Sequence, residues 1–458
     1  MHLNQIMKEN NIKNIKKWLI LFAFTIGYKF ILDYSYISIL GNKVDEFVLD
    51  VCGWKVLLST VIIINIFIRV DQFKREPSIL LFNLFFYVTI IPISVIYGCC
   101  NMNSAYYFII IIGTSICLMI INKSHIAEIN RVNSIKESGV IIPYIGIFTV
   151  GILLCVMLYH FGLPSTDAFN FSKVYDIRLH GDYIDNKIFN YLFNWSTAVI
   201  LPMLIARELT LKRHFFVFIY IAVTVIFYLY TASKAIIFMI PVIVGIYFLS
   251  KTKQVNYWFT LIFNAGIIGV SLLALTDKYL LYSYFVRRAM LLPAYLKFLY
   301  YDFFTIHDKI GLAGTLWGSA AGYPFPYENG LGVEISKYFF NNDIMNSNTG
   351  FLAEGYYRGG YIGVLCVMAL FAVILKQVDR LTERTSLSFA LSFSFYPIYS
   401  LNDSSIIDSI IFGPMLIFVL IILLYSDRRM SGGVNGKKLT IKIQQINLHN
   451  RYNRRTAK

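Results

Sequence analysis

Charged side chains are scarce in this chain. Asp, Glu, Lys and Arg make up only 15% of its 458 residues, whereas hydrophobic residues make up 57%. The mean hydropathy of +0.61 is correspondingly high. A helix that spans a membrane needs about 20 mostly apolar residues. The composition therefore favours a membrane protein with many spans over a soluble enzyme.

Sequence motifs of nucleotide, metal and serine chemistry are also missing. The chain contains no GxxxxGK[ST], GxGxxG, HExxH or GxSxG pattern. Its six cysteines include the neighbours Cys99 and Cys100 but no CxxC spacing, so no zinc or haem site is expected. We therefore expect neither a metal nor a cofactor. No internal repeat and no strand-like alternation of polar and apolar residues is visible.

Twelve apolar runs separated by polar gaps extend along nearly the whole chain. They predict an all-α, polytopic integral membrane protein with about 12 transmembrane helices. The seventh and eighth runs lie on either side of Ser233 and could instead form a re-entrant pair. The first run is too long for a cleavable signal, and no small-residue cleavage site follows it. The predicted spans are Trp18–Leu40, Trp54–Val70, Ile79–Gly98, Tyr106–Asn122, Val140–Phe161, Ile188–Ala206, Phe215–Thr231, Ala235–Ser250, Tyr257–Thr276, Gly359–Leu375, Ser386–Leu401 and Ile406–Tyr425.

Lys and Arg residues gather in alternate connections between these runs. With the N-terminus placed in the cytoplasm, the basic connections all face the cytoplasm, as the positive-inside rule requires. They are residues 8–17, 69–75, 123–136, 207–213, 251–253, 376–384 and the tail 428–458. The net charge of +15 is therefore a topology signal rather than a sign of nucleic-acid binding. We expect both termini in the cytoplasm and the basic tail on anionic lipid headgroups.

Two extracytoplasmic connections are much longer than the others. They cover residues 162–187 and 277–358, and a long loop in a compact domain usually has a function. The second is rich in aromatic residues and is punctuated by Pro and Gly. We expect it to form short amphipathic helices that lie at the membrane surface and roof a cavity.

Arginine is rare on the predicted outer face and falls only in or beside these two loops. The four residues are Arg178, Arg287, Arg288 and Arg358. Because that face has no nucleotides, an enzyme there needs a substrate that carries its own activation, such as a lipid-linked diphosphate. A guanidinium binds phosphate oxygens in pairs and stays charged. The alternative is that these arginines anchor the protein among the headgroups.

Three further polar residues are candidates for the same site. Asp176 and His180 flank Arg178 in KVYDIRLHGDY. The carboxylate would orient the guanidinium and the imidazole would relay a proton, unless the group is only a solvated salt bridge. Lys234 lies in YTASKAIIF between two apolar runs, where an isolated charge usually faces a cavity.

The stretch NSNTGFLAEGYYRGGYIG, residues 346–363, holds the remaining candidates. Glu354 and Arg358 are one helical turn apart and therefore share a face. The apolar neighbours of Glu354 are expected to favour its neutral form and so make it a usable base. Alternatively, the two residues only form an ion pair at a helix end. Asp403 and Asp408, near the outer ends of the last two runs, are further acidic candidates.

Several segments together resemble the O-antigen polymerases, the Wzy-type oligosaccharide repeat-unit polymerases of bacteria. The segments are VYDIR (174–178), YLFNWSTAVILPMLI (191–205), TASK (231–234), VRRAMLLPAYLKFLYYDFF (286–304) and SNTGFLAEGYYRGGYIG (347–363). The resemblance implies a GT-C-like, metal-independent glycosyltransferase with a large extracytoplasmic loop in a bacterial inner membrane. It would polymerise undecaprenyl-diphosphate-linked oligosaccharides into O-antigen or a related surface polysaccharide.

Together with the residues singled out above, this interpretation leads us to expect the following roles and partners. The diphosphate would be bound by Arg178, Arg287 and Arg288, and Glu354 would orient or deprotonate the acceptor hydroxyl with Arg358 as its partner. Substrate binding would be completed by Tyr300, Trp317 and Tyr323, stacking on sugar rings, and by Lys234, Asp176 and His180. The expected partners are membrane lipids and the flippase and chain-length regulator of the same pathway. The alternatives are a flippase or exporter of the lipid-linked oligosaccharide and an O-antigen ligase-like glycosyltransferase.

Overall fold

The computed structural model describes residues 2–41, 46–123, 138–165, 168, 186–276, 278–427 and 429–430. Every regular element in these ranges is a helix, and no strand occurs among them, so the predicted all-α class is confirmed. The chain divides into two units that alternate along the sequence. Unit 1 consists of Met1–Asn130, Phe248–Gln377 and Ser394–Val419, and unit 2 of Arg131–Tyr247, Val378–Phe393 and Leu420–Lys458.

Seven helical stretches among the described residues are long and apolar enough to cross a membrane. They match seven of the predicted spans, and they indicate a membrane-embedded protein. The last predicted span is not one helix, because Phe412 and Gly413 interrupt it after Ile411. The seven stretches are Pro77–Cys99, Ser104–Asn122, Ser138–Phe161, Lys187–Thr210, His214–Thr231, Val255–Ala274 and Phe351–Arg384.

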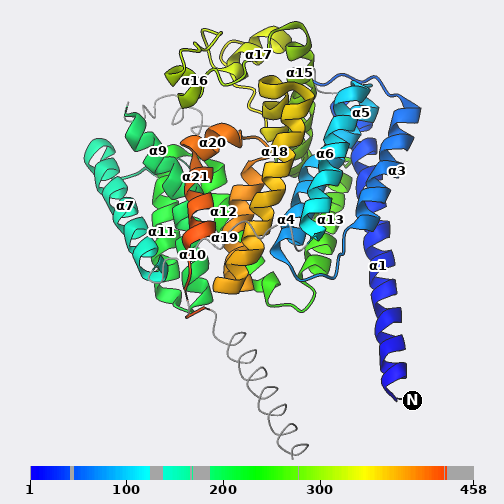
Figure 1. Cartoon of the computed structure of the whole chain (residues 1–458), viewed down its shortest axis with the longest axis horizontal. Helices are drawn as coiled ribbons and strands as arrows, with labels where there is room; N and C mark the ends of the chain where they lie inside the picture. Colours follow the sequence, from blue (N-terminus) through cyan, green and yellow to red (C-terminus); the bar gives the residue numbers. More distant parts are fainter. Residues whose placement is uncertain are drawn as a thin grey trace, which may run out of the picture. The chain divides into compact units, whose positions relative to one another are not determined.

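Unit 1 combines the helices of the first 130 residues with helices from the second half of the chain (Figure 1). Helix α1 packs along α13, and α3 packs against α5. A Cβ on Gly98 would lie 2.7 Å from a methyl of Val56, so the small residue is what allows α3 and α5 to approach so closely. The elements are α1 (His2–Ser35), η1 (Tyr36–Leu40), α3 (Gly53–Arg69), α4 (Pro77–Phe85), η2 (Phe86–Ile90), α5 (Ile91–Cys99), α6 (Ser104–Asn122), α13 (Val255–Ala274), α14 (Tyr279–Tyr282), η5 (Ser283–Leu291), α15 (Leu292–Ile306), α16 (Leu316–Ala320), α17 (Leu331–Phe340) and α20 (Ile407–Ile411), where η marks a π-helical segment.

Unit 2 contains a second set of helices, from the middle of the chain. Helices α10 and α11 pack together, and α7 packs against α9 and α10. Helices α11 and α12 are joined only by Ala232 and Ser233, of which Ala232 is left-handed with φ 48°. The elements are α7 (Ser138–Phe161), α9 (Lys187–Trp195), η4 (Ser196–Ile200), α10 (Leu201–Thr210), α11 (His214–Thr231) and α12 (Lys234–Ser250). The last residues of α12 belong to unit 1, and helices α18 (Phe351–Arg384), α19 (Leu387–Ser400) and α21 (Pro414–Leu424) likewise contribute residues to both units.

The long second loop differs from its prediction. Residues 279–306 form a continuous helix of α14, η5 and α15, and most of α15 is buried rather than lying at a surface. Burial is possible because several polar groups of this helix find partners inside unit 1. The hydroxyl of Tyr282 donates to Ser35 Oγ at 3.0 Å, and that of Tyr300 donates to the Ser347 carbonyl at 3.0 Å. Residues 307–350 connect the end of α15 to the start of α18 and contain α16 and α17 (Figure 1). We call this segment the cap.

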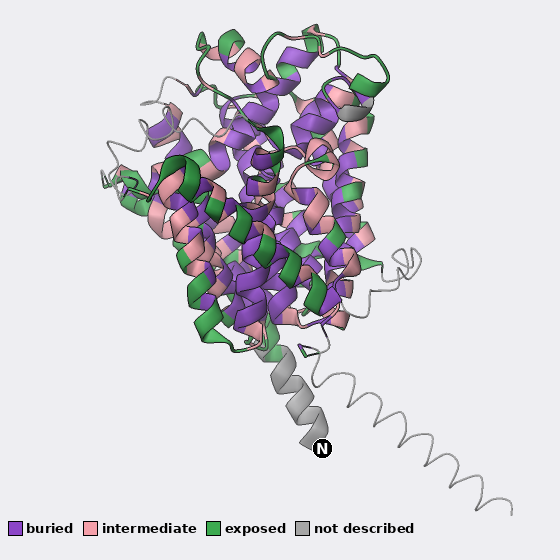
Figure 2. Ribbon diagram, turned by 90° about the vertical axis from the view of Figure 1, so that its left-hand side faces the viewer, coloured by how far each residue is buried: buried purple, intermediate pink, exposed green. Residues whose placement is uncertain are grey.

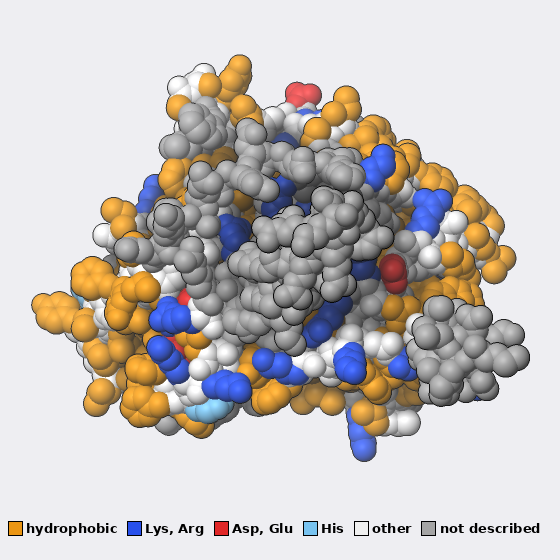
Figure 3. Space-filling model, turned by 60° about the horizontal axis from the view of Figure 1, so that its bottom comes forward, with side chains coloured by type: hydrophobic (Ala, Val, Ile, Leu, Met, Phe, Trp, Pro, Cys, Tyr) orange, Lys and Arg blue, Asp and Glu red, His pale blue; other side chains and the backbone are white. Residues whose placement is uncertain are grey.

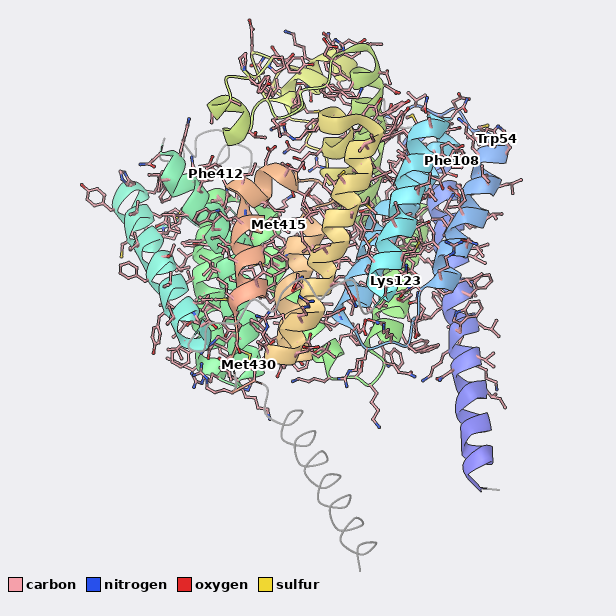
Figure 4. All side chains as sticks on the ribbon, viewed as in Figure 1. Trp54, Phe108, Lys123, Phe412, Met415 and Met430 are labelled. Carbon is pink, nitrogen blue, oxygen red and sulfur yellow. The ribbon has the colours of Figure 1, made fainter. Side chains whose placement is uncertain are left out.

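Connections predicted to share a side of the membrane lie together in unit 1. At one end, Arg75 donates to the Ser250 carbonyl at 3.1 Å, and Lys376 Nζ lies 3.6 Å from a carboxylate oxygen of Glu76. Lys123 lies near that end in Figure 4, and Lys and Arg side chains are seen on the face turned forward in Figure 3.

At the other end of unit 1, the connections before α3 and after α5 meet. Lys55 Nζ donates to the Met102 carbonyl at 2.6 Å, and Asn101 Nδ2 donates to Asp50 Oδ2 at 2.9 Å. Trp54 and Phe108 lie near this end (Figure 4). Trp54 is 56% exposed, as is usual for the aromatic residues that border a membrane. Exposed side chains are concentrated on the outer helix faces and the cap, and buried ones fill the interior (Figure 2).

Candidate functional site

The carboxylate of Glu354 is buried and surrounded by hydrogen-bond donors. Its side chain is 1% exposed in the first part of α18. Oε2 accepts from the backbone amides of Ile406 at 2.7 Å and Ile407 at 3.0 Å. Oε1 accepts from the Ser405 hydroxyl and from Arg358 Nε at 3.2 Å. Glu354 therefore holds the segment that leads into α20, and these donors both stabilise its charge and fill its acceptor sites.

The guanidinium of Arg358 is equally occupied. Its Nη2 donates to both carboxylate oxygens of Asp408, at 2.8 and 3.0 Å. Its Nη1 donates to the carbonyls of Gly311 at 2.8 Å and Ala313 at 3.2 Å, which belong to the cap. The predicted pairing of Glu354 with Arg358 on one helix face is thus present, as part of a network that ties α18 to α20 and to the cap. All three nitrogens of the Arg358 guanidinium have acceptors, and only Asp408, 45% exposed at its side chain, is readily reached from outside.

A sharp kink follows Arg358. Gly360 has φ 62° and ψ −148°, a conformation that side chains with a Cβ rarely adopt. The kink brings Gly355 against Gly363, so that a Cβ on Gly363 would lie 2.0 Å from the Gly355 carbonyl oxygen. The glycines of EGYYRGGYIG therefore set the direction in which Glu354 and Arg358 point.

The glycine contact leads to a testable prediction. Gly363→Ala is expected to destabilise the protein by about 1–3 kcal/mol, the usual cost of overpacking, because backbone atoms rather than flexible side chains block the new methyl group. Gly359→Ala is the matched control, since no atom lies within 4 Å of its Cβ position and its φ of −132° suits alanine. Thermal unfolding of the two purified variants makes the comparison. Equal unfolding temperatures would contradict the close approach.

A pair of arginines forms a second cluster in unit 1. Arg287 Nη2 lies 2.5 Å from Glu46 Oε2, while Arg287 Nε is buried without a hydrogen-bond partner among the described residues. The hydroxyl of Tyr279 is also buried, beside Ser283, and burial raises its pKa while the charges of Arg287 and Arg288 partly offset this. Arg288 itself is exposed. Although Glu46 occupies one nitrogen of Arg287, the buried Arg287 Nε and the exposed Arg288 guanidinium are donors with no acceptor among the described residues, which is what an anion-binding site requires.

Lys297 is a polar residue that the sequence reasoning did not single out. It has no exposed surface, although it lies in the apolar stretch AYLKFLYY of α15. Its Nζ donates to the Asn402 carbonyl at 2.7 Å and to the Pro293 carbonyl at 3.1 Å. The sequence could have indicated Lys297, because it is a single charge within an apolar run, as Lys234 is.

The remaining predicted residues are spread over several places. Tyr300 is 3% exposed and packs against Tyr357, so the expected stacking of its ring on a sugar does not hold in this arrangement. Tyr323 is 61% exposed on the cap. Trp317 belongs to α16, also in the cap.

The other predicted residues do not fall in unit 1. Lys234 is half-buried at the start of α12 in unit 2. Arg178, Asp176 and His180, like most of the basic tail, lie outside the described residues. Among the described residues, no group of three or more His, Cys, Asp or Glu side chains could hold a metal ion. No family model, no curated protein and no solved structure matches the chain.

Proposed function

We propose that the chain is a membrane glycosyltransferase of the O-antigen polymerase type. It joins undecaprenyl-diphosphate-linked oligosaccharide repeat units at the outer face of a bacterial inner membrane, with a GT-C-like, metal-independent mechanism. The growing glycan on its lipid diphosphate is the donor, and a single lipid-linked repeat unit is the acceptor. Its partners are membrane lipids and the flippase and chain-length regulator of the same pathway.

The observation that carries the proposal is the Arg287–Arg288 cluster. When the acceptor hydroxyl attacks the anomeric carbon, the bond to the diphosphate breaks and negative charge grows on the leaving group. Donors that already point at that charge lower the barrier, because they need no reorganisation during the reaction. The buried Arg287 Nε, which has no acceptor among the described residues, and the exposed Arg288 suit this task. The motif resemblance of residues 174–363 and the exposed Tyr323 on the cap add support.

The product distinguishes this function from its alternatives. We expect purified protein in lipid vesicles to convert lipid-linked repeat units into a ladder of longer lipid-linked glycans. A flippase would move the repeat units across the bilayer without lengthening them. A ligase would not lengthen the lipid-linked glycan and would instead transfer it to a different lipid acceptor. A product that contains only single repeat units would overturn the proposal.

The membrane orientation can be tested separately. We propose that the cap faces the outside and that both termini face the cytoplasm, because the connections of unit 1 that hold Arg75, Lys123 and Lys376 lie at its end away from the cap. A reporter fused after Gly314 is expected to read extracytoplasmic, and one after Lys251 cytoplasmic. A cytoplasmic signal at Gly314 would contradict both the orientation and the outward-facing site.

A further inference from the structure

The buried lysine of α15 holds a turn between α19 and α20. Besides the contacts already described, Lys297 Nζ lies 3.3 Å from Asn402 Oδ1, which also accepts from the Thr89 hydroxyl at 2.9 Å. Asn402 itself is only 6% exposed. A buried amide whose oxygen and nitrogen are both bonded is held in one orientation. The turn of residues 401–405 is therefore fixed by contacts inside unit 1.

The same turn lies beside the arginine pair. Asn402 Nδ2 donates to the Ala289 carbonyl at 2.9 Å, so the residue after Arg288 is bonded to the residue before Asp403. On its far side the turn continues into Ser405 and Ile406, which bond to Glu354. The turn of residues 401–405 thus connects the arginine cluster to the Glu354 network. Asp403, in the middle of this turn, carries a carboxylate.

Asp403 differs from Glu354 in the way that matters for proton transfer. It is exposed, and no described side chain forms an ion pair with it within 4 Å, whereas Glu354 has donors on both oxygens. Enough protein surrounds Asp403 that desolvation raises the pKa of its carboxyl, and the charge of Lys297 partly offsets this. Tyr396 and Tyr399 of α19 are the other titratable groups that face it. A carboxylate in such surroundings is a stronger base than a fully solvated one.

We propose that Asp403 is the catalytic base of the glycan transfer and that Lys297 is the residue that positions it. The inference rests on the proposed function. The carboxylate takes the proton of the acceptor hydroxyl while the hydroxyl oxygen bonds to the anomeric carbon. The bond from that carbon to the diphosphate oxygen breaks, and its electron pair leaves with the lipid diphosphate, next to Arg287 and Arg288. The proton on Asp403 then passes to solvent.

The first test is the pH dependence of coupling by purified protein in vesicles. The coupling rate of the wild type is expected to fall as the pH is lowered, because the base must be deprotonated. This fall, here called the acid limb of the pH profile, should occur at a pH above the ordinary pKa of about 3.9 for Asp. Asp403→Asn is expected to lower the coupling rate by about 100-fold or more, the usual scale for loss of a general base, and to remove this acid limb. Asp343→Asn is the matched control, since it removes an exposed carboxylate of the cap.

The second test separates positioning from mere support of the fold. Burial lowers the pKa of Lys297 to about 7, against a smaller raising effect of Asp403, so the lysine is charged on the acid side of neutrality. In that range its charge holds the pKa of Asp403 lower than burial alone would. Lys297→Met removes the charge at similar volume, so the acid limb is expected to move to higher pH. If Lys297 only supported the fold, Lys297→Met would change the amount of active protein but not the pH at which the acid limb occurs.

The outcomes are distinguishable from failure of the proposed function. If wild-type protein forms no polymer, the glycosyltransferase proposal fails. If wild-type protein polymerises and Asp403→Asn does so equally well with an unchanged pH profile, the inference about Asp403 is wrong. It is also wrong if Asp302→Asn abolishes the acid limb instead, since Asp302 is another exposed carboxyl of unit 1 and burial raises its pKa to about 6.

Discussion

Arg288→Ala is expected to slow repeat-unit coupling by about 100-fold or more, the effect typical of removing one donor that stabilises transition-state charge. Arg288 is exposed and, unlike Arg287, has no acidic partner among the described residues, so its removal leaves no buried charge unpaired. The unfolding temperature should therefore stay close to that of the wild type. The measurement combines the initial coupling rate in vesicles with thermal unfolding of the purified protein.

Two variants sharpen this prediction. Arg288→Lys keeps the charge but not the paired geometry, and should recover only part of the rate. Lys337→Ala removes an exposed cation from α17 in the cap and should leave the rate near that of the wild type. Normal polymer from Arg288→Ala at normal protein levels would mean that the arginine only anchors the helix among lipid headgroups.

The sequence was informative wherever a property follows from local spacing. Hydropathy located the long apolar helices, since a span needs only length and apolar composition. The i, i+4 spacing of Glu354 and Arg358 correctly predicted that they pair on one face of a helix, because the α-helical repeat alone brings such residues together. The expected start of a span at Gly359 also coincides with the kink in α18.

The buried helix of residues 279–306 could not be recognised in the same way. Its two arginines, one lysine and several tyrosines lower its hydropathy below that of a span. Its burial depends on partners far away in sequence, such as Ser35 for Tyr282 and Asn402 for Lys297. A hydropathy profile includes the free-energy cost of burying a polar side chain. It does not include the distant hydrogen-bond partner that offsets this cost.

The donors around Glu354 were hidden for a related reason. The two closest backbone donors are the amides of Ile406 and Ile407, and apolar residue names carry no sign that their N–H groups face a carboxylate. The sequence showed only apolar neighbours along α18, and these favoured a neutral acid. The three-dimensional contacts instead show a carboxylate whose hydrogen bonds hold the segment that leads into α20, which changes what a substitution at this position should do.

Glu354→Gln is expected to destabilise the protein rather than to remove a base from an intact site. The carboxylate accepts on both oxygens, whereas a carboxamide presents an NH2 group to one set of donors, either the two amides or the Ser405 hydroxyl and Arg358. Loss of one partner from a buried ion pair typically costs roughly 3 to 5 kcal/mol. The unfolding temperature and the yield of inserted protein should both fall, and Glu354→Asp should not rescue them because its side chain is one methylene too short.

The coupling rate per folded molecule decides between this structural role and catalysis. Under the structural role, the Glu354→Gln protein that does fold should retain Arg358 in contact with Asp408, and its loss of activity should follow its loss of stability as temperature is raised. Glu328→Gln, an exposed carboxylate of the cap, serves as the control for the change of charge. A catalytic base would behave in the opposite way. Glu354→Gln would then unfold at the wild-type temperature and couple repeat units at least about 100-fold more slowly, and that result would return the proton-accepting role from Asp403 to Glu354.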